Sequence, residues 1–246
     1  MSEFLSRYGV LLLNGTLESL YMTLVPTLLA YVIGLPLGVL LTVTKPGGFM
    51  ETPQFNAAFG WLVNIFRSIP FMILMLFLTP FTRAVMGTSI GASAANLPLT
   101  VAAAPFVARM VEQSLEEVDG GVIEAARCMG ATNWQIITRV LLVESVPSLL
   151  RGLTISTITV FGYTAITGAT GAGGLGNIAF RFGYQRYQQS VMYASLALVI
   201  LVVCLIQTVF GHLASKADKP LNLFLYFPRP GENKCLSAKF RSIERT

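Results

Sequence analysis

One stretch of the chain contains Glu124-Ala125-Ala126, then Gly130 after three residues, and Val140-Leu141-Leu142 after nine more. It is rich in small and polar residues, and long apolar stretches lie before and after it. Because Ala125, Ala126 and Gly130 are small, a partner approaching this stretch can come close to its backbone. In a chain otherwise suited to lipid, the stretch predicts a docking surface for a soluble partner.

Large side chains and charge in the same stretch support this interpretation. Met129 and Trp134 are suited to anchor a partner, since methionine and aromatic residues are enriched at interfaces. We expect Gly130 to divide the stretch into two short helices. We expect Glu124 near the start of the first helix, where a negative charge favours the helix dipole. An amphipathic hairpin packed on its own bundle is the alternative, and the stretch alone does not separate the two.

The composition is that of a membrane protein. Hydrophobic residues make up 54% of the 246-residue chain and charged residues 12%, against about 25% charged in a soluble domain. The mean hydropathy is +0.66, and the apolar residues occur in runs long enough to cross a bilayer. Residues 1–9 carry one Glu and one Arg, which is unlike a cleavable leader, so we expect the first span to act as its own insertion signal.

Five apolar stretches predict membrane-spanning helices, because about 20 apolar residues cross the hydrocarbon core. They are residues 20–43, 57–81, 92–111, 146–167 and 191–213. The predicted fold is all-α, with one membrane domain over residues 1–216, a cytoplasmic loop over 112–145 and a basic cytoplasmic tail over 217–246. Proline in or beside the spans predicts kinks.

The distribution of basic residues predicts the orientation, since Lys and Arg favour the cytoplasmic side. If the C-terminus is cytoplasmic, four arginines lie outside the cell and Arg67 lies within a span. Twelve of the 17 basic residues fall inside if the C-terminus is cytoplasmic: Lys45, Arg109, Arg127, Arg139, Arg151, Lys216, Lys219, Arg229, Lys234, Lys239, Arg241 and Arg245. We therefore expect the N-terminus outside and the C-terminus inside, and a net charge of +5 that reflects topology rather than nucleic-acid binding.

The charges also exclude several functions. No Asp or Glu lies between Glu51 and Glu112 or between Glu144 and Asp218, so the later spans lack the carboxylates that ion-coupled carriers place in the membrane. The single histidine, His212, is expected at a membrane interface. The sequence contains no catalytic pair of carboxylates, no clustered metal ligands and no phosphate-binding G-x-x-x-x-G-K-[ST] loop. We therefore expect no catalytic residue, cofactor or metal on this chain, although sodium sites built from carbonyl groups stay open.

A glycine-rich segment, Gly171–Gly176, matches the dinucleotide pattern G-x-G-x-x-G by letter. That motif requires a preceding strand, a following helix and an acidic residue about 20 positions later. Here the segment follows a predicted span, and no acid occurs before Asp218. We expect a re-entrant turn on the outer side of the fourth span, with glycines supplying positive φ and close packing.

Several segments together resemble the permeases of methionine ABC importers, and the resemblance extends over about residues 14–213. The Glu124 stretch resembles the "EAA" loop of ABC-importer permeases in general. The segments that make the resemblance more specific are Arg67–Phe71, Pro80–Arg83, Gly87–Gly91, Pro98–Thr100, Ala104–Glu112, Met129–Thr132, Gly162–Tyr163 and Gly171–Asn177.

The resemblance implies a function and a set of partners. It implies a type I importer core of five helices per subunit, a homodimer in a bacterial inner membrane, and two cytoplasmic ATPases docked on the paired loops. It also implies an external lipid-anchored methionine-binding protein, with ATP and magnesium bound by the ATPases rather than by this chain. Glu124, Ala125, Ala126, Met129, Gly130 and Trp134 are the coupling residues it indicates. An ABC permease for another small solute and an ion-coupled secondary transporter are the alternatives.

For the translocation pathway, the second and fourth spans supply the candidates near the dimer axis. An apolar, polarisable lining suits a methionine side chain, which Met72, Met75 and Ile166 offer. Packing between helices is the alternative for each residue, and Arg67 is open to either an interfacial or a pathway position. The pathway candidates are Ser68, Pro70, Met72, Tyr163, Ile166 and Thr167.

Two features depart from the family pattern. Val143 follows Leu142 where the family usually has proline, and the next proline is Pro147. We therefore expect a straighter helix after the loop. The tail after residue 216 is longer than the family pattern, and its apolar patch Leu221–Phe227 is too short to span; a surface-lying segment on anionic lipid and a tail without a role are both open.

Overall fold

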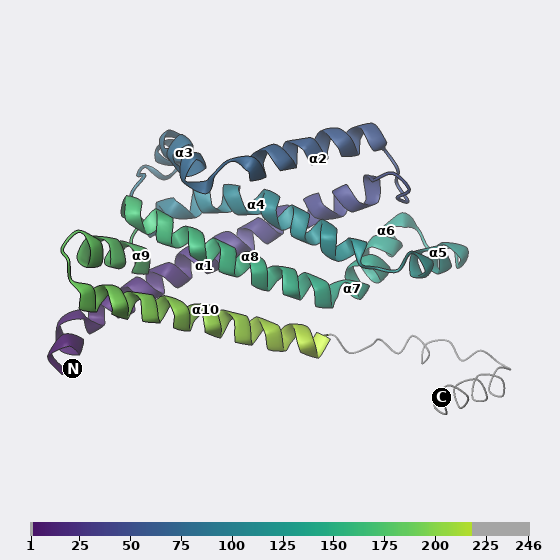
Figure 1. Cartoon of the computed structure of the whole chain (residues 1–246). Coiled ribbons are helices and arrows are strands. Elements are labelled where there is room, and N and C mark those ends of the chain that lie inside the picture. The colour runs from purple at the N-terminus through teal and green to yellow at the C-terminus, as the bar shows by residue number, and fades with distance from the viewer. Residues whose placement is uncertain (1, 218–246) are drawn as a thin grey trace, which may run out of the picture.

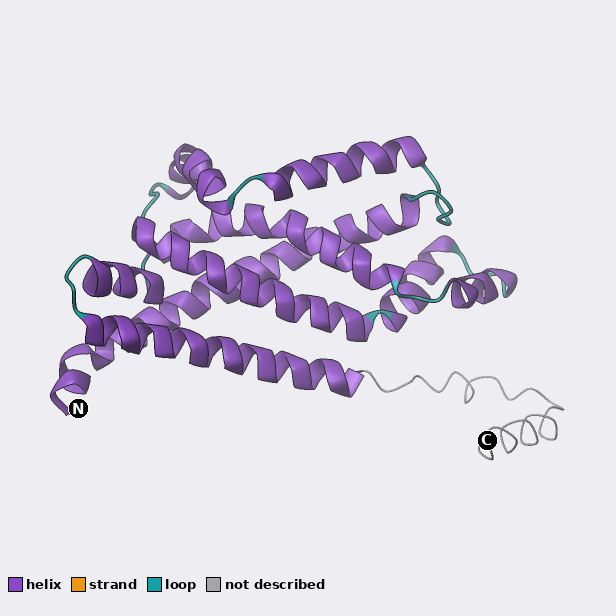
Figure 2. Ribbon diagram, in the orientation of Figure 1, coloured by secondary structure: helices purple, strands orange, loops and turns teal. Residues whose placement is uncertain are grey.

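A computed structural model describes residues 2–217, with side chains from Ser6 onward, so the predicted tail lies outside the described residues. Within that range the chain consists of helices joined by short loops (Figure 2). The elements are α1 Ser2–Thr44, α2 Pro53–Ser68, α3 Phe71–Met86, α4 Ala92–Glu116, α5 Gly120–Cys128, α6 Asn133–Gln135, η1 Ile136–Leu141, α7 Leu142–Glu144, α8 Val146–Thr167, η2 Gly168–Ala172, α9 Gly174–Ile178, η3 Ala179–Tyr184 and α10 Gln189–Ala217.

The long helices form one bundle. Helices α1, α4, α8 and α10 are long and apolar enough to cross a membrane, and the bent pair α2–α3 gives a fifth crossing when it is counted as one broken span. In Figure 1 the start of α1, α3 and α9 lie at one end of the bundle, whereas α5, α6 and the end of α10 lie at the other. The two ends of the described chain thus lie on opposite sides. The predicted all-α architecture with five crossings is confirmed.

The second span differs from its prediction as one helix over 57–81. Helices α2 and α3 meet at 97° across a break at Ile69 and Pro70. Proline disfavours the helical conformation for the residue before it, and Ile69 is extended, with φ −78° and ψ 120°. A kink was expected here, but the chain turns almost at right angles. The first span also differs: α1 has 43 residues, about 65 Å at 1.5 Å per residue, so it begins well before the predicted residue 20.

The centre of the bundle is the contact between α1 and α4. Ala30, Gly34 and Gly38 repeat every four residues on α1, and all three are buried. A Cβ atom at Gly34 would lie 2.7 Å from Val107 Cγ1, and one at Gly38 would lie 2.6 Å from the Ala108 carbonyl oxygen. Small residues at this spacing let two helix backbones approach closely. The resulting core contains four side chains that are 0% exposed: Met22, Ala30, Leu99 and Val107.

The glycine-rich segment forms a turn with the positive φ values expected from the sequence. Gly171, Gly173 and Gly174 all have positive φ, at 99°, 97° and 77°. The turn packs on α1, where the Gly174 N–H donates to Glu18 Oε2 at 2.7 Å. The Leu175 N–H donates to Ser19 Oγ at 2.8 Å. The first-span carboxylate therefore satisfies the backbone of a segment more than 150 residues away.

Two polar contacts fasten α2 to the bundle. Asn56 Nδ2 donates to the Leu41 carbonyl at 2.7 Å, which ties the start of α2 to the end of α1. Arg109 on α4 donates to the Gly60 carbonyl at 2.9 Å and forms an ion pair with Glu112. The side chains of Arg109 and Glu112 are only 18% and 13% exposed, so water has little access to this ion pair.

We expect Arg109→Leu to lower the free energy of unfolding by about 3 kcal/mol, because removing one partner leaves the other charge buried and unpaired. Thermal unfolding in detergent measures the effect. The double variant Arg109→Leu/Glu112→Leu should recover more than half of the loss, since no unpaired charge remains. Lys45→Gln serves as the control: its ion pair with Glu116 is 38% and 43% exposed, and such pairs contribute about 1 kcal/mol or less. Equal losses in Arg109→Leu and Lys45→Gln would contradict the prediction.

Candidate functional site

The docking stretch begins with helix α5, whose start is set by Asp119. The Asp119 carboxylate accepts a hydrogen bond from the Gly121 N–H at 2.7 Å, a side-chain cap that satisfies a free backbone donor. The prediction that Glu124 lies near the helix start is wrong, because Glu124 is the fifth of nine residues in α5. The negative charge at the positive end of the helix dipole therefore belongs to Asp119.

Gly130 ends α5 and turns the chain into α6, as the sequence predicted. Its φ is +81°, a conformation that glycine adopts without steric cost. The Gly130 N–H donates to the Arg127 carbonyl at 2.9 Å, and the Ala131 N–H donates to the Ala126 carbonyl at 3.1 Å. These bonds close the C-terminus of α5 on both sides of the glycine, so the angle between the two short helices is well defined.

A capping box that the sequence reasoning missed starts α6. The Gln135 N–H donates to Thr132 Oγ1 at 3.3 Å, and the Thr132 N–H donates to Gln135 Oε1 at 2.9 Å. The pattern Thr-x-x-Gln before an apolar run is the sequence signature of this motif, so it was available. Together with Gly130, the box places Trp134 one turn beyond the bend.

The two sides of the docking stretch differ in exposure. Ala126 is 4% exposed and Ile136 is 0% exposed, so this side packs on the bundle. Met129 is 64% exposed and Trp134 is 72% exposed. Glu124, Ala125 and Gly130 are also exposed. Five of the six predicted coupling residues thus lie on an open surface, which we call the docking face; Ala126 supports it from below.

The link between α1 and α2 supports the docking stretch. The Arg127 guanidinium lies 5.6 Å from the centroid of the Phe49 ring, a distance at which cation–π attraction operates. Lys45 Nζ lies 2.9 Å from Glu116 Oε1 at the end of α4. Three segments distant in sequence therefore contact one another at this end of the bundle. Phe49 was not identified from the sequence, because a single aromatic residue in a loop has no distinguishing pattern.

The segment that returns from the docking stretch to α8 is not the straight helix expected from Val143. Residues 136–141 form a π-helix, and the chain is irregular again at Ser145, where ψ is −1°. Pro147 follows at the second position of α8 and lacks a backbone donor. Ile137 and Leu141 belong to the same buried cluster as the α1–α4 core, so the docking stretch is continuous with the centre of the bundle.

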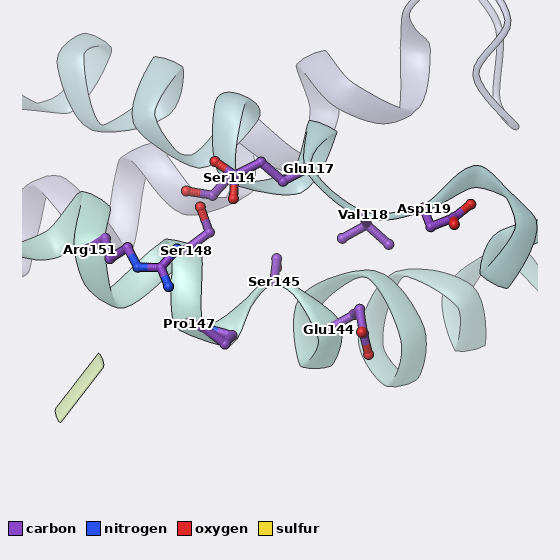
Figure 3. A pocket seen from close by; sticks show the side chains of 9 residues that line it. All are labelled: Ser114, Glu117, Val118, Asp119, Glu144, Ser145, Pro147, Ser148 and Arg151. Atoms are coloured by element: carbon purple, nitrogen blue, oxygen red, sulfur yellow. The ribbon is translucent and has the colours of Figure 1, made fainter. Parts of the chain in front are cut away.

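A cavity of about 250 Å³ lies between the end of α4 and the α7–α8 junction (Figure 3). Its wall carries carboxylates from both sides and one guanidinium. The lining residues are Ser114, Glu117, Val118, Asp119, Glu144, Ser145, Pro147, Ser148 and Arg151. The cavity lies between the two segments of chain that lead into and out of the docking stretch.

The pathway candidates lie around the α2–α3 break and the second half of α8. The rings of Phe71 and Tyr163 stack with centroids 4.5 Å apart and planes at 10°, which joins α3 to α8. Met72 is 53% exposed, and Ser68 and Pro70 are exposed beside it. The structure thus brings Pro70, Met72 and Tyr163 to one region, and Phe71 is the residue that the sequence reasoning missed.

The two remaining pathway candidates pack inside the subunit. Ile166 is half-buried against the central cluster. Thr167 is 0% exposed, and its hydroxyl donates to the Thr164 carbonyl at 2.9 Å. In this conformation Thr167 stabilises the end of α8 and presents no free polar atom. Among residues 2–217, no group of three or more His, Cys, Asp or Glu side chains has the geometry of a metal site.

Comparisons with known proteins agree in both sequence and structure. Residues 34–217 match the family described as "Binding-protein-dependent transport system inner membrane component". The chain is 45% identical over 204 residues to the probable D-methionine transport system permease protein MetI of Pasteurella multocida, covering 83% of this chain and 94% of that protein. It is 43% identical over 218 residues to the probable D-methionine transport system permease protein MetI of Vibrio cholerae, covering 89% and 97%.

Solved structures show the same fold. A chain of the inward-facing MetNI methionine ABC transporter superposes with a TM-score of 0.85 at 48% identity, covering 87% of this chain and 99% of that chain. A chain of an amino acid ABC transporter crystallised with histidines superposes with a TM-score of 0.67 at 20% identity, a similarity that concerns the fold alone.

Proposed function

Because the chain belongs to the family of binding-protein-dependent transport system inner membrane components, whose members are non-catalytic transport subunits, we propose that it is the membrane permease of an ATP-driven methionine importer. The observation that carries the proposal is the TM-score of 0.85 at 48% identity, over 87% of the chain, with a subunit of a methionine ABC transporter. The curated relatives, named for D-methionine transport, support the same substrate. An ABC permease for another small amino acid is the second candidate, since an external binding protein selects the substrate.

In this proposal the chain works as part of a larger assembly in the bacterial inner membrane. Two copies form the pathway, two cytoplasmic ATPases bind ATP and magnesium, and an external lipoprotein delivers methionine. The N-terminus lies outside and the C-terminus inside, which the distribution of Lys and Arg supports. The second to fifth predicted spans carry no Asp or Glu to relay protons, so ATP hydrolysis on the partner chains provides the energy.

The docking face transmits the motion of the ATPases. Met129 and Trp134 are exposed apolar side chains outside the predicted spans, and such residues anchor interfaces when a groove receives them. Glu124, Ala125 and Gly130 present a small-residue surface beside them, and Ala126 holds that surface on the bundle. Movement of the docking face reaches the pathway through Ile137 and Leu141, which belong to the central buried cluster.

The pathway proposal retains the six residues Ser68, Pro70, Met72, Tyr163, Ile166 and Thr167. Ser68, Pro70 and Met72 are exposed in the isolated subunit and lie with Tyr163 around the helix break, where a pathway between two subunits would meet them. Ile166 and Thr167 support this region from within α8, and their contribution requires a rearrangement of that helix end. A thioether side chain suits the sulfur-containing and aromatic lining nearby.

The experiment that tests the proposed function is uptake of labelled methionine into proteoliposomes that contain this chain, its co-purifying ATPase and its binding protein. We expect uptake that requires ATP inside the vesicles and the external binding protein. ATP hydrolysis without methionine uptake would reject methionine as the substrate. Uptake driven by an ion gradient without an ATPase would reject the importer.

Truncating the tryptophan of the docking face should weaken ATPase association. We expect Trp134→Ala to lower the affinity of the permease for its ATPase by about 30-fold, since buried tryptophans at interfaces contribute about 2 kcal/mol or more. Trp61→Ala is the matched control, because Trp61 on α2 is 69% exposed and Trp134 is 72% exposed. The measurement is co-purification and a titration of the ATPase against permease in nanodiscs. Equal affinities for the Trp134→Ala and Trp61→Ala permeases would contradict the assignment of the docking face.

A further inference from the structure

A basic side chain lies at mid-depth in the bundle, at the break between α2 and α3. The Arg67 guanidinium carbon lies 5.8 Å from the centroid of the Phe106 ring. Phe106 is the fifteenth of the 25 residues of α4, so about 21 Å of helix precede it and about 15 Å follow it. The hydrocarbon core is about 30 Å thick. The side chain that holds this charge therefore meets α4 within the depth of the membrane.

No carboxylate of this subunit neutralises Arg67 among the residues with described side chains. The ion pairs in residues 6–217 are Lys45–Glu116 and Arg109–Glu112. Glu18, the acid of the first span, accepts its hydrogen bond from the Gly174 N–H. The second to fifth predicted spans carry no acid at all. A positive charge in the membrane without a counterion is costly, and such residues mark the paths of ions and substrates.

The surroundings of Arg67 suit one kind of anion. Phe71, which follows the break, stacks on Tyr163 of α8. Met72 lies exposed next to it, and Met75 Sδ one turn later lies 3.6 Å from Thr170 Oγ1. The residues that follow Arg67 across the break thus add aromatic and thioether groups to one positive charge. Sulfur makes favourable contacts with aromatic rings, and a guanidinium binds a carboxylate through two parallel hydrogen bonds.

We propose that Arg67 binds the α-carboxylate of the amino acid in transit, while the Phe71–Tyr163 stack and Met72 receive its apolar side chain. This inference rests on the proposed function, because it names how the importer holds its substrate at mid-membrane. Arg67 is exposed in the isolated subunit, so its guanidinium can be reached from outside the subunit. The contact with Phe106 holds the guanidinium against α4.

The test compares four permeases in the complete assembly with ATPase and methionine-loaded binding protein in proteoliposomes. They are the wild type, Arg67→Met, Arg67→Lys and the matched control Arg83→Met, which removes an exposed arginine from the end of α3. Methionine uptake and ATP hydrolysis stimulated by the loaded binding protein are measured on the same vesicles. We expect Arg67→Met to reduce uptake at least about 10-fold and to leave stimulated hydrolysis within about 2-fold. Arg67→Lys should fall between, and Arg83→Met should match the wild type.

A further variant, Phe106→Leu, separates substrate binding from packing. It removes the aromatic partner of Arg67 and keeps the charge, so we expect at least half of the wild-type uptake. Loss of uptake in Phe106→Leu equal to that in Arg67→Met, or a parallel loss of uptake and hydrolysis in Arg67→Met, would assign Arg67 to packing and overturn the inference. Undiminished uptake by Arg67→Met would overturn it as well, with the proposed function intact. Absence of ATP-driven uptake in the wild type would instead reject the proposed function.

Discussion

Replacing Gly38 with leucine should prevent α1 and α4 from packing, and it should leave little folded permease to extract from the membrane. A Cβ atom at Gly38 would lie 2.6 Å from both the Ala108 carbonyl oxygen and Val111 Cβ. The oxygen belongs to the backbone of α4, so relief requires the two helices to separate rather than one side chain to rotate. Overpacking costs about 1–3 kcal/mol even where side chains can shift, and we expect the upper end or more here.

The effect is measured as the yield of monodisperse protein in detergent and as its thermal midpoint. A loss of about 3 kcal/mol corresponds to a midpoint about 10 °C lower for a chain of this length. Gly211→Leu in α10 is the matched control, because a Cβ atom there would meet nothing within 4 Å. A Gly38→Leu permease as stable as Gly211→Leu would show that the close approach of α1 and α4 does not hold the bundle together.

Replacing Gly130 with valine should uncouple the permease from its ATPase without unfolding the bundle. The φ of Gly130 is +81° and a Cβ atom there would meet no neighbour within 4 Å, so the obstacle is backbone strain and not space. An L-residue in the left-handed region costs roughly 1–2 kcal/mol, and a β-branched residue adopts it least readily. If the strain is relieved by a change in the angle between α5 and α6, Met129 and Trp134 no longer lie on one face.

We expect Gly130→Val to weaken ATPase binding about 5- to 30-fold, which is the strain expressed as an equilibrium constant. Uptake at limiting ATPase should fall by a similar factor. Gly130→Asn is the matched control, since asparagine tolerates the left-handed region, and it should stay within about 3-fold of the wild type. A loss that is the same for valine and asparagine would mean that the surface of Gly130, and not its conformation, matters for coupling.

The membrane class and the break at Gly130 were predictable because both are encoded locally. The runs of apolar residues that form α4, α8 and α10 satisfy the bilayer whatever their neighbours are. Gly130 was predicted to break the stretch into two helices, and its positive φ explains why. Glu124 was expected near the start of α5, but Asp119 holds that position, since the sequence pattern does not fix where the first helical turn closes.

The sequence by itself determined that this protein is an all-helical membrane protein with a helical stretch, rich in small and polar residues, between its third and fourth predicted spans. Only the tertiary structure decided which polar groups meet: Glu18 with Gly174, Arg109 with Gly60, and Arg67 with Phe106. It also decided that Thr167 is buried and that α2 and α3 meet at 97°. The physical reason is range. Burial in lipid and turn conformation are set by residues close in sequence, whereas the partner of a buried charge or hydroxyl is supplied by a helix tens of residues away.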